Sequence, residues 1–167
     1  IYLAFRPEAS AEPLVRTTSM VAQSAPFLFL VSAFLIEATT LDLVSRYVGE
    51  GLPLPYRISA VWGSRSGPLL MWASMMGVIT WVMSRDDKVD TTTIRVMHSW
   101  TALLLLISAA LRPFSPAYPG SVGEISPLLQ TDLMVIHPPV VFVYYSLCLA
   151  TASIALSGLI MTSPSEE

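Results

Sequence analysis

The sequence predicts an all-α membrane protein with about four transmembrane helices and two long loops on one face. Hydrophobic residues make up 53% of the 167 residues and charged residues only 13%, with a mean hydropathy of +0.62. Soluble domains carry roughly 25% charged residues, so lipid is the expected solvent for much of the chain. The net charge of -3 is small and basic runs are absent from the sequence, which argues against a nucleic-acid partner.

The apolar runs define one membrane domain, residues 20–161, between a surface arm at 1–19 and a polar tail at 162–167. The arm is placed at the surface because it is broken by proline and moderately charged. A bilayer core of about 30 Å needs roughly 20 helical residues. Four spans are expected, at about 20–41, 67–84, 94–111 and 138–161. The first span reaches this length only by bringing Glu37 close to an interface.

Glycine, proline and charge mark the connections between these spans. Two glycines and two prolines interrupt residues 49–55 in the first connection, and residues 85–93 form a short charged turn. The third connection, residues 112–137, is long and rich in proline. Four spans place the first and third connections on the same side. Basic residues are almost evenly divided between the two sides, so the positive-inside rule leans only weakly toward placing the long loops outside.

His137 is the strongest candidate for chemistry because it stands directly before Pro138 and Pro139. A residue before proline is biased toward extended backbone, and proline suits the first turn of a helix. The sequence therefore predicts that His137 lies at an ordered entry into the fourth span, at the membrane surface. A helix N-terminus disfavours a protonated imidazole, and the neutral form binds haem iron. The alternative is a histidine that caps the helix or hydrogen-bonds within the loop.

The other candidate residues have simpler alternatives. His98, near the start of the third span, is expected to be an interfacial histidine rather than a ligand. Arg46, Arg57 and Arg65 share the first long loop and could pair with carboxylates such as haem propionates, or could simply be solvated. Cys148 is the only cysteine, which excludes an intrachain disulfide and any CxxC or CxxCH motif. The sequence contains no Walker loop, GxGxxG or Ser-His-Asp pattern, and no catalytic residue is assigned.

Two loop motifs point to a known family. The first is YRISAVWGSRSGPLLMW, residues 56–72, and the second is PLLQTDLMVIHPP, residues 127–139. They resemble YYKxSAxWGxHEGSLLLW and LNPLLQxxxLxxHPP of the CcmF-type cytochrome c haem lyase subunit, a member of the WWD superfamily of haem-handling proteins. The supporting stretches LDLVSRYVGEGLPLP (41–55) and LRPF (111–114) occur in the matching order. The resemblance covers about residues 20–160, the N-terminal part of that family's chain.

The resemblance implies a role in attaching haem to the CxxCH thiols of apocytochrome c, with haem received from a haem chaperone. In that family a tryptophan-rich WWD motif forms a haem platform flanked by two surface histidines, which are axial ligands. His137 matches the first of these, so the resemblance implies an axial ligand to the iron of a haem b shared with partner chains. Trp62 is expected to pack beside the HPP segment and to help bind haem. Arg57 and Arg65 are expected to contact a haem propionate or an acidic partner loop.

Departures from the family pattern shape the functional hypotheses. The family's His-Glu after the tryptophan-glycine pair is Arg65-Ser66 here, and the asparagine of LNPLLQ is Ser126. The chain stops before the WWD motif, so it is not expected to be catalytic alone. The first hypothesis is a split subunit of a cytochrome c maturation haem lyase in the mitochondrial inner membrane, with the WWD motif on a partner chain. The alternative is a structural subunit of a respiratory or other membrane complex that keeps the fold without haem chemistry.

Overall fold

The computed structural model describes residues 13–49, 51–121, 123, 125–127 and 130–162. The helices are α2 (Pro13–Leu35), α3 (Asp42–Tyr47), α4 (Leu54–Ser59), the 3-10 helix η2 (Ala60–Gly63), α5 (Ser66–Met83), α6 (Thr91–Ala110) and α7 (Asp132–Thr162). Four of them, α2, α5, α6 and α7, are long and apolar enough to cross a membrane. This confirms the predicted all-α membrane fold with four spans. The polar tail and most of the expected arm lie outside the described residues.

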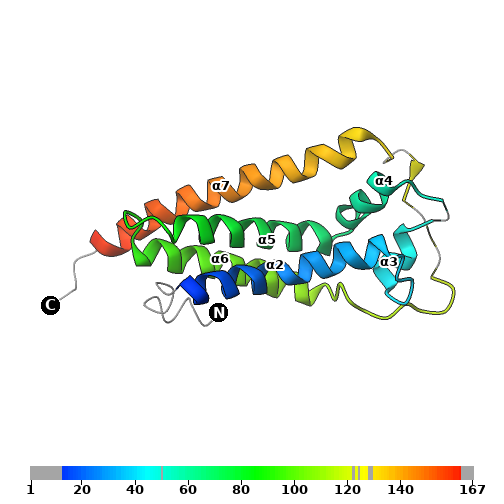
Figure 1. The fold of residues 1–167 in the computed structure, drawn as a ribbon, viewed down its shortest axis with the longest axis horizontal. Coiled ribbons are helices and arrows are strands. Elements are labelled where there is room, and N and C mark those ends of the chain that lie inside the picture. Colours follow the sequence, from blue (N-terminus) through cyan, green and yellow to red (C-terminus); the bar gives the residue numbers. More distant parts are fainter. Residues whose placement is uncertain (1–12, 50, 122, 124, 128–129, 163–167) are drawn as a thin grey trace.

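Helix α5 lies at the centre of the bundle and packs against α2, α6 and α7 (Figure 1). The face of α7 that is buried consists of small residues one or two turns apart: Ser146, Ala150, Ser153 and Ser157. Apolar side chains gain little by leaving lipid, so close packing of small residues is what holds membrane helices together. Trp72 of α5 adds aromatic contacts with Phe142 and Tyr145 of α7, at centroid distances of 5.8 and 5.7 Å.

The two long loops meet at one end of the bundle, as predicted (Figure 1). Leu41 of the first loop and Pro116 of the third form an isolated antiparallel bridge. Beside it the Asp42 amide donates to the Ser115 carbonyl oxygen at 2.9 Å. These backbone bonds satisfy polar groups that would be costly to leave free near lipid. The loops therefore form one joined cap over the ends of α2, α5 and α6.

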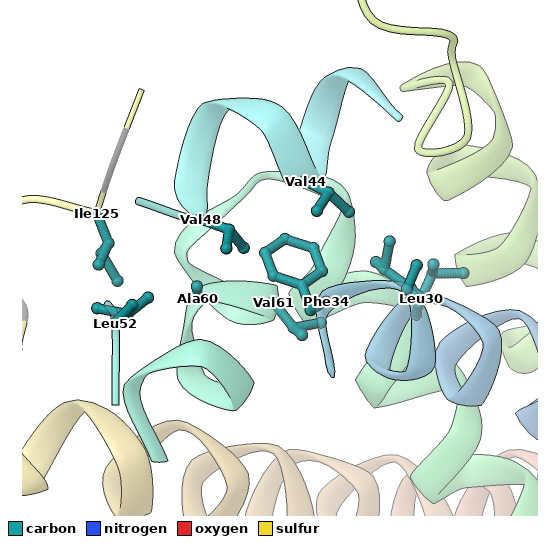
Figure 2. Close-up of a cluster of buried hydrophobic side chains, with 10 residues drawn as sticks. Leu30, Phe34, Val44, Val48, Leu52, Ala60, Val61 and Ile125 are labelled. Carbon is teal, nitrogen blue, oxygen red and sulfur yellow. The ribbon is translucent and has the colours of Figure 1, made fainter. Parts of the chain in front are cut away.

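A hydrophobic cluster fixes this cap to the bundle. Figure 2 shows the ring of Phe34, from the end of α2, among Val44, Val48 and Val61 of the first loop. Phe34, Val44 and Val61 are fully buried. Fully burying a side chain of this size contributes about 1.5–3 kcal/mol. The first loop is thus a packed extension of the bundle.

Helix α2 differs from the first predicted span at both ends. Its described part runs from Pro13, so the helix includes residues 13–19 of the predicted arm. It ends at Leu35, before the expected limit at residue 41. Glu37 adopts a left-handed conformation with φ of 54°, and the Ala38 amide bonds back to the Ala33 carbonyl at 2.9 Å. This pattern terminates a helix by capping its last free carbonyls.

Helix α7 begins at Asp132, so the prediction that His137 is extended and precedes the fourth span is wrong. His137, Pro138 and Pro139 all lie within the helix. The hydroxyl oxygen of Thr131 accepts from the Met134 amide at 3.3 Å, and Asp132 stands in the first turn. Both features favour a helix start at this point. They outweigh the tendency of Pro138 to keep the residue before it out of the helical region.

Candidate functional site

Trp62 joins the two motifs that gave the family resemblance. Its indole Nε1 donates to the carbonyl oxygen of Met134 at 2.7 Å. In a regular helix that carbonyl would accept from the amide four residues later, and residue 138 is a proline without an amide hydrogen. Trp62 therefore supplies the donor that Pro138 removes. The prediction that Trp62 packs beside the HPP segment is confirmed, and its role in binding a cofactor stays a prediction.

The turn that positions Trp62 depends on a close backbone approach. A Cβ added at Gly67 would lie 1.8 Å from the carbonyl oxygen of Val61. The Ser64 hydroxyl donates to that same oxygen and accepts from the Gly67 amide, both at 3.0 Å. The WGSRSG segment is thus a tight connection between η2 and α5 that only glycine at position 67 allows. It holds Trp62 against the start of α7.

His137 is exposed on α7 at the loop end of the bundle. At the opposite end, the Ser157 hydroxyl donates to the carboxylate of Asp90 at 2.6 Å, beside the short turn between α5 and α6. About 20 residues of helix separate Ser157 from His137, which amounts to about 30 Å at 1.5 Å per residue. That is the thickness of a bilayer core. If the Asp90 end of the bundle marks one membrane surface, His137 is at the height of the other surface, on the side of the long loops, although within a helix.

Arg57 is committed to contacts within this chain. It pairs with Glu37 at 2.7 Å and donates to the carbonyl oxygens of Leu35 and Leu52 at 3.3 and 3.2 Å. Leu35 is the last residue of α2, so Arg57 neutralises the end of that helix and joins it to α4. This places an acidic neighbour beside Arg57, and the neighbour belongs to its own loop. Contact with a haem propionate or a partner chain remains a prediction.

Arg65 is exposed and lines a cavity of about 340 Å³ together with Arg46 and Asp42. Asp42 and Arg46 form an ion pair at 2.9 Å. The other residues around this cavity come from α3, the start of α5 and the end of α6, and His137 is not among them. The structure therefore brings Arg46 and Arg65 together, while Arg57 and His137 occupy separate places at the same end of the bundle.

His98 is buried against the neighbouring helices, which the sequence did not indicate, and its position relative to the membrane interface stays a prediction. Its Nδ1 lies 3.2 Å from the Nε2 of Gln23, which also donates to the Ser19 hydroxyl at 2.6 Å. Gln23 is the one residue of α2 with an amide side chain, and it lies four residues after Ser19, on the same helix face. This polar pair in an apolar helix could have indicated from the sequence that α2 makes a polar contact there. The role that the contact supports is structural, a polar bridge between α2 and α6.

The arrangement around His137 fits one axial position of a haem rather than an enclosed haem pocket. His137 is exposed, and the described part of the chain provides it with no hydrogen-bond partner, so a ring nitrogen is available to iron. The other histidine of the chain, His98, contacts Gln23 inside the bundle through its Nδ1. Among the described residues, no group of three or more His, Cys, Asp or Glu side chains could hold a metal ion. The described residues provide neither a second axial ligand nor most of a haem pocket.

Four apolar spans and a joined pair of long loops at one end of the bundle define a multi-pass helical membrane protein. The Cytochrome C assembly protein family matches residues 62–165, and the chain belongs to that family. The chain is 32% identical to cytochrome c-type biogenesis protein CcmF of Escherichia coli K12 over 129 residues, 71% of this chain and 20% of the relative. Identity to Pseudomonas aeruginosa CcmF is also 32%, over 77% of this chain and 22% of the relative.

A further relative is the probable cytochrome c-type biogenesis protein NrfE of Escherichia coli, 28% identical over 78% of this chain and 25% of the relative. The chain thus spans about a fifth to a quarter of the length of these relatives. No solved structure matches. These relatives are cytochrome c-type biogenesis proteins, and this chain matches one part of their much greater length.

Proposed function

We propose that this chain is a membrane subunit of a cytochrome c maturation haem lyase. In this proposal His137 is one axial ligand of a haem bound at the outer face of the membrane that the chain spans. The observation that carries the proposal is the bond from Trp62 to the Met134 carbonyl. It fixes the helical turn that presents His137, without using the imidazole itself. A ligand on a supported helix is held more precisely than one on a free loop.

The haem would supply the vinyl groups that react with cysteine thiols, and this chain's residues would orient it. His137 would hold the iron from one side. Arg65 lies in a cavity that does not include His137, and Arg57 is already paired with Glu37, so contact of either with a propionate stays a prediction. The remaining parts, including a WWD platform and a second axial histidine, would come from partner chains, with a haem chaperone and apocytochrome c as transient partners.

A structural subunit of a larger membrane complex is the second candidate. It is favoured by the contacts of Arg57, which serve the chain's own fold. It is also favoured by the substitution of Arg65-Ser66 for the His-Glu of the family pattern. In this case the bundle would be retained as a scaffold, and His137 would not bind haem iron.

Identification of the chains that copurify with this protein in mild detergent distinguishes the two candidates. The lyase proposal predicts a chain that carries a WWD motif, together with haem absorbance in the purified complex. Recovery of respiratory subunits alone, without haem on a WWD chain, would support the structural role. The relatives named above are bacterial, so they give no support to the mitochondrial membrane expected from the sequence. Cell fractionation tests that prediction.

A further inference from the structure

The cavity of about 340 Å³ beside Arg65 has features of a binding site distinct from the His137 surface. Its polar lining includes Asp42, Arg46, Ser64, Arg65 and Ser66, from α3 and the η2–α5 connection. Arg65 and Ser66 are the residues at which the chain departs from the family pattern. The charge of Arg65 therefore belongs to this chain rather than to the family pattern, whereas Asp42 and Arg46 lie in a stretch that resembles the family.

Two polar atoms of the cavity lining are buried and without a hydrogen-bond partner in the described part of the chain: Oγ of Ser66 and Oδ1 of Asp42. Ser66 is only 2% exposed. A buried polar group without a partner costs free energy, so both atoms indicate a group that completes them. Ser66 can donate to an acceptor, whereas the Asp42 carboxylate can only accept. A single group that completes both atoms would present both an acceptor and a donor.

The charge of the lining gives the same result. The charges of Arg46 and Asp42 balance each other in their ion pair, so the guanidinium of Arg65 gives the cavity lining a net positive charge. The N-terminus of α5 adds partial positive charge at Ser66. An anionic group is favoured beside Arg65 and Ser66, and the Oδ1 of Asp42, which the ion pair with Arg46 does not use, can accept from an N–H donor. A zwitterion with a phosphate and an ammonium group has this distribution.

The cavity lies at the loop end of the bundle, where the expected membrane spans meet the loops. It is formed where α5 begins and where α6 ends, at the boundary between the spans and the loops. Leu111 lines it and is 42% exposed. Leu103 and Ile107 precede Leu111 by two turns and one turn of α6 and are exposed to a similar degree. These three side chains share one helix face and form an apolar stripe that leads from the membrane interior to the cavity.

We propose that this cavity binds the headgroup of phosphatidylethanolamine. The lipid phosphate accepts from Arg65 and Ser66, the ammonium donates to Asp42, and an acyl chain lies along Leu103, Ile107 and Leu111. The headgroup satisfies both buried polar atoms, and the stripe accounts for the acyl chain. The bound lipid would fasten α3 to the junction of α5 and α6.

Native mass spectrometry of the full chain, released from nanodiscs with equal amounts of three lipids, tests the proposal. Phosphatidylcholine, phosphatidylethanolamine and phosphatidylglycerol are used with matched acyl chains. Phosphatidylcholine has the same charges as phosphatidylethanolamine but no N–H donor for Asp42. Wild-type protein is expected to retain phosphatidylethanolamine in preference to both other lipids. Loss of a charge-assisted bond lowers retention by about tenfold.

Variants assign the contacts. Arg65→Gln is expected to reduce retention of all three lipids. Asp42→Asn is expected to abolish the preference for phosphatidylethanolamine over phosphatidylcholine while lipid binding continues. Arg112→Gln is the matched control, because Arg112 is exposed at the same end of α6 but lines a different cavity. Its lipid retention should equal that of wild type.

Three results would overturn the proposal. The first is equal retention of the three lipids by wild type. The second is unchanged retention in Arg65→Gln, and the third is displacement of bound lipid by excess inorganic phosphate, which would indicate a site for free anions.

Discussion

The indole nitrogen of Trp62 and the carbonyl oxygen of Met134 lie 2.7 Å apart, and that carbonyl is the acceptor that Pro138 leaves free in α7. The two residues are far apart in the chain and belong to the two motifs that gave the family resemblance. Their bond explains physically why a tryptophan in the first long loop and a proline after His137 occur together. It also places the turn that carries His137 at a fixed position against the first loop.

A double-mutant cycle tests this relationship. Trp62→Phe keeps most of the ring but leaves the Met134 carbonyl without a donor, so unfolding free energy should fall by about 1–3 kcal/mol. Pro138→Ala restores a helical amide to the same carbonyl, so Trp62→Phe should cost less in that background. Unfolding in mixed micelles measures the coupling. Pro139→Ala is the control, and its effect should add to that of Trp62→Phe. Additive effects for Pro138→Ala would contradict the pairing.

Gly67 is predicted to be intolerant of any side chain. A Cβ at this position would lie 1.8 Å from the Val61 carbonyl oxygen, so Gly67→Ala must displace the connection between η2 and α5. We expect a loss of stability of about 3 kcal/mol or more, within the range of severe substitutions. Gly158→Ala, within α7, has nothing within 4 Å and should be neutral or stabilising by up to about 1 kcal/mol. Thermal unfolding of the two variants should diverge, and equal melting temperatures would show that the close approach is absent.

Arg57 should be sensitive to the shape of its side chain. Arg57→Lys retains the charge, but one ammonium cannot reproduce the contacts with Glu37, Leu35 and Leu52. Glu37→Gln removes only the partly exposed ion pair, whose contribution is about 0–1 kcal/mol. Arg57→Lys is therefore expected to reduce the unfolding free energy more than Glu37→Gln does. The reverse order would show that the charge pair, and not the capping of α2, is the main contact.

Asp90 should make stability depend on pH in the acid range. Burial raises the pKa of this carboxyl, but hydrogen bonds from Ser157 and Thr93 outweigh burial and hold the pKa below the ordinary value of 3.8. The stabilisation is therefore complete above that value and is lost as the pH falls through the lower, folded pKa. Asp90→Asn retains a helix cap and should show a flatter decline below about pH 4. Unfolding curves measured from pH 7 to pH 3 check the difference, and parallel declines would argue against it.

The sequence was sufficient for the number of spans and for the common side of the long loops, because apolar length and span parity determine both. It did not indicate that His137 lies inside α7. The local rule for a residue before proline was outweighed by the Thr131 cap and by the Trp62 bond, a contact across 72 positions. The burial of His98 could not be predicted for a similar reason, since it depends on packing against Gln23 of another helix. Partner choice, such as Arg57 with Glu37, also depends on how loops fold together.

The central claim is that His137 is an axial haem ligand in an assembled complex, and haem absorbance of that complex tests it most directly. His137→Ala should lower the haem retained per complex, while the copurifying chains remain unchanged, because His137 is exposed and contributes little to packing. His98→Asn is the matched control, since asparagine keeps an acceptor near Gln23, and its haem content should equal that of wild type. Added imidazole should restore haem to His137→Ala. Wild-type haem content in His137→Ala, in an intact complex, would contradict the account and leave this chain as a scaffold of the family.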